Sequence, residues 1–117
     1  MTAMQADIKN ISANDIDQWP NWRPADSTDE FQWFSVLIGR TGASGADLFQ
    51  VAVATYRGLE ARRHKSKFVG LVVDVFEPRV IEQAIEDFVA AAEASTWEAV
   101  VEQLQTTMRW EFANYRP

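Results

Sequence analysis

The chain has 117 residues, 12% of them aromatic, no cysteine and a net charge of −6. This length fits one domain spanning residues 1–117, and the aromatic content suffices for a packed core, which excludes a disordered chain. The lack of cysteine excludes disulfides and thiolate-ligated metal sites. Because we find neither a signal-peptide pattern nor an apolar run long enough for a membrane span, we expect a cytoplasmic protein with no membrane partner.

The charge is unevenly distributed along the chain. Residues 1–30 carry a net charge of −4 and residues 68–117 carry −6, whereas the short segment 57–67 carries +4. A mostly acidic chain is a poor nucleic-acid binder, because contacts to phosphate dominate such affinity. It suits a basic protein partner, since opposite fields speed encounter. We therefore expect a protein partner and no nucleic acid, and the sequence leaves the oligomeric state open.

The first half of the chain predicts three strands. Residues 5–11 form the first, and residues 31–38 form the second, which is apolar on both faces and is therefore expected to be central. A glycine-rich turn at residues 39–45 separates it from a third strand at residues 48–55. A strand, a short glycine loop and a strand predict an antiparallel hairpin.

Between the first two strands, residues 12–30 predict one long loop rich in turn-forming residues. Loops of this length in compact domains are often functional. We expect Trp19 and Trp22 to attach part of the loop to the core, and tryptophan is also enriched at interface hot spots. The residues predicted to face a partner are Asp15, Asp17, Trp19, Trp22, Asp26, Asp29 and Glu30.

The second half changes from strand to helical periodicity. Residues 56–67 predict a polar, basic connection with a helical turn near Leu59, and residues 68–73 predict a fourth strand. A helix follows with Pro78 at its first position. Residues 95–98 (Ser-Thr-Trp-Glu) read as a capping box that starts a second helix, whose apolar face carries Trp97, Val101, Leu104 and Met108.

Together these elements predict an α+β fold, in which an antiparallel sheet of about four strands packs against a C-terminal helical hairpin. The order of the strands does not follow from the sequence. The sheet face that the helices leave uncovered is a natural docking surface.

Residues that would support catalysis or metal binding are scarce. The only histidine, His64, lies among cations, with no carboxylate beside it to orient the ring. The spacing Gly39-x-x-Gly42-x-x-Gly45 lacks the Lys-Ser/Thr ending of a phosphate loop and precedes a strand. Asp15 and Asp17 start like a calcium loop but lack its glycine and closing glutamate. We therefore expect no catalytic residues, no metal and no cofactor.

Three stretches together resemble a known family. They are residues 6–26, with Ala6-Asp7-Ile8-Lys9-Asn10-Ile11 and Trp22-Arg23-Pro24-Ala25-Asp26, residues 38–55 around the glycine-rich turn, and Thr96-Trp97-Glu98 with the ending Trp110-Glu111-Phe112-Ala113-Asn114-Tyr115-Arg116-Pro117. The pattern is similar to the immunity protein 8 family of bacterial polymorphic toxin systems, and it departs from that family at residues 56–67. The ending has its own physical reading, in which Trp110, Phe112 and Tyr115 fold back onto the sheet.

The resemblance implies an α+β protein that binds the C-terminal domain of a cognate bacterial toxin in the cytoplasm and blocks it. It implies no catalytic residues. Two rival hypotheses are a module that binds a small molecule between the sheet and the long loop, and a hydrolase that uses acid pairs. The second requires carboxylates that converge in a cleft.

Overall fold

A computed structural model of the chain describes residues 3–16, 19, 21–61 and 69–111. Several predictions fall on residues outside these ranges. They concern Asp17, the basic run 62–67 with His64, Phe68, and the tail residues Phe112, Tyr115 and Arg116.

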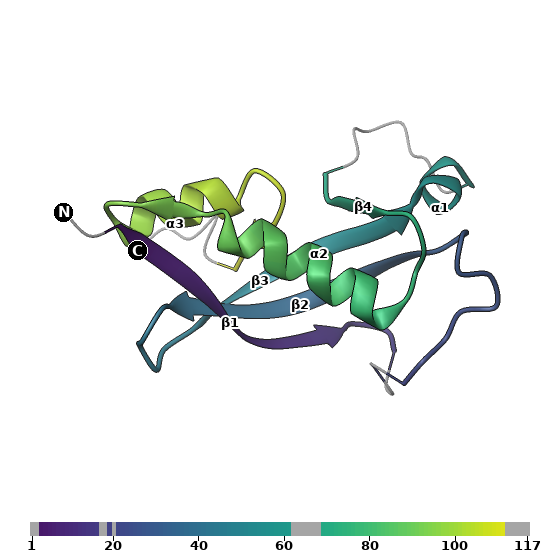
Figure 1. The fold of residues 1–117 in the computed structure, drawn as a ribbon, viewed down its shortest axis with the longest axis horizontal. Helices are drawn as coiled ribbons and strands as arrows, with labels where there is room; N and C mark the ends of the chain where they lie inside the picture. Colours follow the sequence, from purple (N-terminus) through teal and green to yellow (C-terminus); the bar gives the residue numbers. More distant parts are fainter. Residues whose placement is uncertain (1–2, 17–18, 20, 62–68, 112–117) are drawn as a thin grey trace.

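Three long strands form the middle of a sheet. They are β1 (Met4–Ala13), β2 (Phe31–Arg40) and β3 (Asp47–Thr55), and each pairs antiparallel with the next. A shift in register interrupts the β1–β2 pairing between Ile8 and Asn10. The predicted central position of β2 and the predicted β2–β3 hairpin are both confirmed, and Figure 1 shows the three strands running side by side.

Three short strands complete the sheet. β4 (Leu71–Val73) lies parallel to β3, β5 (Glu93–Ala94) pairs with β1, and β6 (Arg109–Trp110) pairs antiparallel with β3. The strand order is β4-β3-β2-β1-β5, with β6 beside β3. The prediction of an antiparallel sheet of about four strands is therefore corrected, because the sheet is mixed and the described residues form six strands. Residues 56–70 give the chain the length it needs to cross over and enter β4 in the direction of β3.

In the described ranges, three helices accompany the sheet. The short α1 (Tyr56–Ala61) follows β3 directly and contains the predicted helical turn near Leu59. α2 (Pro78–Ala90) begins with Pro78 at its first turn, as predicted, and buries Ile81, Ile85 and Val89. Pro78 fits there because its fixed φ suits the helix and the first turn needs no donor from it.

α3 (Trp97–Leu104) is the predicted second helix, but the predicted capping box at Ser95–Glu98 is wrong. The N-cap is Thr96, whose side chain accepts a hydrogen bond from the backbone N–H of Ala99 at 3.2 Å. The third helical position is thus Ala99 and not Glu98, so no glutamate is placed to return the hydrogen bond. The helix ends before Met108, which is nevertheless buried in the core.

The predicted helical hairpin is not confirmed. The strand β5 separates the two helices, and α2 packs against β1 and β4 whereas α3 packs against β5 and β1. Each helix thus covers its own part of the sheet (Figure 1).

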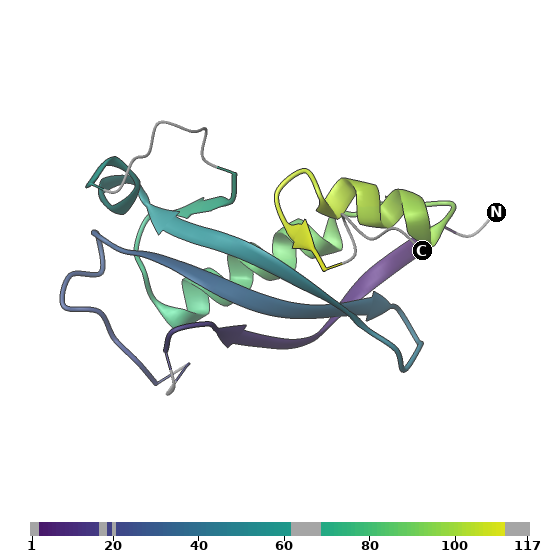
Figure 2. The same ribbon diagram turned by 180° about the vertical axis from the view of Figure 1, so that it is seen from behind.

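The core lies between α2 and the sheet face that it crosses. Phe34, Val36, Phe49, Val51 and Phe76 have no exposed surface there. Figure 2 shows the sheet from the side opposite α2, where no described helix crosses the middle of β1 and β2. Side chains alternate along a strand, so Trp33, Ser35 and Leu37 of β2 point to this second face, and Leu37 is exposed.

Candidate partner-binding site

The segment between β1 and β2 is attached to the core by two tryptophans. The ring of Trp19 meets Phe34 edge-to-face with centroids 5.0 Å apart, and the ring of Trp22 meets Phe76 in the same way at 6.0 Å. Both indoles are half-buried. The prediction that these residues hold the loop to the core is confirmed, and each retains some exposed surface.

A turn at Asp26 fixes the second half of the segment. One carboxylate oxygen of Asp26 accepts hydrogen bonds from the backbone N–H and the hydroxyl of Thr28, at 2.9 and 2.7 Å. The guanidinium of Arg57 donates to Thr28 Oγ1 at 3.0 Å and lies 3.4 Å from the other oxygen of Asp26. The bonds from Thr28, with a smaller contribution from Arg57, lower the pKa of Asp26 below 3.8.

The base of the segment is joined to β3 and α1. The backbone N–H of Thr55 donates to the carbonyl of Glu30 at 3.0 Å, and the N–H of Glu30 donates to the Thr55 hydroxyl oxygen at 3.1 Å. Thr55 is buried, and its Oγ1 also accepts from the N–H of Gly58 at 3.0 Å. Further along, the carbonyl of Ser27 accepts from the N–H of Phe76 at 2.6 Å.

The predicted acids of the segment have different surroundings. Asp15 and Asp26 are exposed, whereas Asp29 and Glu30 are half-buried. Glu30 Oε1 accepts hydrogen bonds from the N–H of Phe31 and from Gln32 Nε2, both at 3.1 Å. Glu30 therefore has a structural use at the start of β2. Within the described part of the chain, no three acidic or histidine side chains gather in a way that could hold a metal ion.

The C-terminal strand is anchored as the sequence predicted for Trp110. The rings of Trp110 and Phe49 stack with centroids 6.4 Å apart. The N–H of Leu48 donates to the Glu111 carboxylate at 3.1 Å, and the N–H of Glu111 donates back to the Leu48 carbonyl at 3.0 Å.

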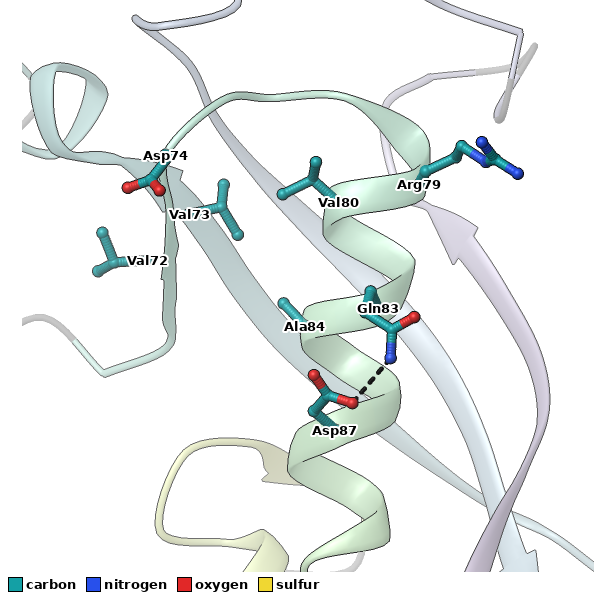
Figure 3. A pocket seen from close by; sticks show the side chains of 8 residues that line it. All are labelled: Val72, Val73, Asp74, Arg79, Val80, Gln83, Ala84 and Asp87. Atoms are coloured by element: carbon teal, nitrogen blue, oxygen red, sulfur yellow. Dashed lines mark hydrogen bonds between the residues drawn. The ribbon is translucent and has the colours of Figure 1, made fainter.

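A groove that the sequence did not predict lies between β4 and α2 (Figure 3). Its volume is about 650 Å³, and it is lined by Val72, Val73, Asp74, Arg79, Val80, Gln83, Ala84 and Asp87. The sequence signal was weak, because the groove depends on β4 lying beside β3 in parallel. Of the groove, only the polar side of α2, with Gln83 and Asp87, could be recognised from the sequence.

The glycine-rich turn between β2 and β3 is a hairpin turn, as predicted. Gly42 has a φ of +83°, a conformation that glycine adopts at little cost. Because β3 follows directly, the turn provides no helix N-terminus for a phosphate.

Comparison with known proteins shows which family the chain belongs to. Residues 6–115 match the family model described as Immunity protein 8. No curated protein and no solved structure matches the chain significantly. None of the helices in the described ranges has the length and apolar character needed to cross a membrane. Since the family match spans nearly the whole chain, the protein belongs to the immunity protein 8 family.

Proposed function

We propose that this protein neutralises a cognate bacterial toxin in the cytoplasm of the producing cell by binding its C-terminal domain in a stoichiometric complex. The observation that carries the proposal is the family match over residues 6–115. The protein acts by occluding the toxin and not by catalysis. A net charge of −6 supports this role, because an acidic surface attracts a basic partner and speeds the encounter.

The toxin contact that we propose is the segment that holds Asp15, Asp17, Trp19, Trp22, Asp26, Asp29 and Glu30. Its support is the number of fixed points along it: two edge-to-face tryptophans, the Asp26–Thr28 turn and the hydrogen bonds to Thr55. Residues that are already fixed in this way lose little conformational freedom on binding, so more of the contact energy appears as affinity.

A charge reversal at Asp15 tests this contact. Asp15 is exposed, so Asp15→Lys is expected to weaken the complex by about tenfold or more while leaving the protein folded. The control is Glu102→Lys on α3, which makes the same change of net charge at another exposed acid. The affinity of both variants is measured by calorimetric titration with the toxin domain that is encoded beside the gene of this protein.

The outcomes of this titration separate the function from the contact. A one-to-one complex of the unchanged protein supports the function. Equal affinity of the Asp15 and Glu102 variants would remove the segment from the interface, and no complex with the unchanged protein would refute the proposed function.

A further inference from the structure

The groove between β4 and α2 combines an apolar wall with charged ends. Val73 on β4 and Val80 and Ala84 on α2 line its sides, and Val72 keeps 37% of its surface exposed. Figure 3 shows Val73, Val80 and Ala84 between the strand and the helix. The groove is open to solvent, and its volume of about 650 Å³ leaves room for a long side chain of another molecule.

Two acids and one cation line the groove. Asp74 lies at the end where β4 leads toward α2, and Asp87 lies at the opposite end (Figure 3). Gln83 Nε2 donates a hydrogen bond to Asp87 Oδ1 at 2.7 Å, which holds that carboxylate in place. Arg79 is the one cation among the lining residues, and its side chain extends away from the groove.

This arrangement complements a basic side chain. Lysine and arginine place an aliphatic stem along apolar surface and keep the charged head beside polar groups. The stem would pack on Val73, Val80 and Ala84, and the head would meet Asp87 or Asp74. A carboxylate or a wholly apolar side chain would leave one part of the groove unmatched.

We infer that the groove is a second toxin contact, in which a lysine or arginine side chain from the toxin lies between β4 and α2 with its cationic head at Asp87. The inference rests on the proposed function. It places the contact on the helical layer, separately from the segment with Asp15.

Charge reversal at neighbouring positions of α2 tests the inference. Asp87 lines the groove, whereas Glu86 is exposed on the same helix and does not line it. Asp87→Lys and Glu86→Lys change the net charge equally, so the long-range field is matched. Calorimetry with the toxin domain encoded beside the gene should show a loss of affinity at least tenfold greater for Asp87→Lys. Equal losses would overturn the groove contact and leave the proposed function standing, whereas no binding by the unchanged protein would refute both.

A footprint gives a measurement that does not depend on the charge change. The chain has no cysteine, so Ala84→Cys introduces a single thiol in the groove with little change of volume. Saturating toxin is expected to slow the alkylation of this thiol by about tenfold or more, and to leave the thiol of Glu102→Cys on α3 unaffected. Unchanged alkylation of Ala84→Cys in a formed complex would show that the groove stays open.

Discussion

Asp26 shows how one side chain sets the shape of the segment that precedes β2. Its carboxylate closes a turn onto Thr28 and faces Arg57, and both interactions are stronger with the ionised form. The folded protein therefore holds the pKa of Asp26 below the ordinary 3.8. Its contribution to stability is fully present above that ordinary value and is lost as the pH falls through the lowered pKa.

The variant Asp26→Ala tests this linkage. We expect it to melt at a lower temperature than the unchanged protein at pH 7, and the difference between the two melting temperatures should shrink as the pH falls below the ordinary pKa of Asp26. Thermal unfolding followed by circular dichroism at a series of pH values measures both. The effect should be small, because the carboxylate is exposed. A gap that stays constant with pH would contradict the linkage.

Gly58 in α1 must be a glycine, because the backbone of Glu30 lies too close for a side chain. A Cβ at this position would clash with the backbone of Glu30, which is itself bonded to Thr55. We expect Gly58→Ala to lower the free energy of unfolding by about 2 kcal/mol, as overpacking typically does. Gly45→Ala is the control, since nothing lies within 4 Å of its Cβ. Urea titration measures the free energy of unfolding of both variants, and similar losses of stability would count against the close contact.

At the scale of elements, the start of α3 depends on one cap. Thr96→Ala removes the acceptor for the N–H of Ala99 and should destabilise the protein by about 1 kcal/mol. Thr96→Ser retains the hydroxyl and should lose much less. Equilibrium unfolding distinguishes them, and a loss from the serine variant as large as that from alanine would indicate that the methyl group matters more than the cap.

Elements with a strong local signal were predicted from the sequence, and elements fixed by distant partners were not. β2, β3 and α2 are long and periodic, so their type followed from their own residues. The parallel position of β4 depends on pairing with β3, and β5 and β6 have only two residues each, too few for any period. The helical hairpin is not confirmed, because β5 occupies the connection on which that prediction relied.

The features of the candidate site also divide into those that a local pattern predicts and those that depend on distant residues. The attachment of Trp19 and Trp22 followed from large apolar rings in a polar segment. The pairing of Asp26 with Arg57 joins residues 31 positions apart, and the β4–α2 groove needs the assembled sheet. No pattern of neighbouring residues in the sequence predicts the Asp26–Arg57 pair or the β4–α2 groove.

At the scale of the whole molecule, the proposed function implies that the negative field sets the rate at which the toxin is bound. If the partner is basic, raising the salt concentration from about 0.05 to 0.5 M should slow association by about tenfold or more, because screening shortens the reach of the field. Stopped-flow mixing measures the association rate, and the dissociation rate should change much less. An association rate that is insensitive to salt would show that charge does not steer the encounter.

The pairing of β3 with β6 has a consequence for protein synthesis. In β3, Phe49 and Gln50 pair with Trp110 and Arg109, which the ribosome adds about sixty residues later. A nascent chain released before that point keeps a bare hydrogen-bonding edge and lacks the indole that stacks on Phe49, which favours association with other chains. Prematurely terminated products are therefore expected to aggregate, so that only chains translated beyond Trp110 would yield the folded protein.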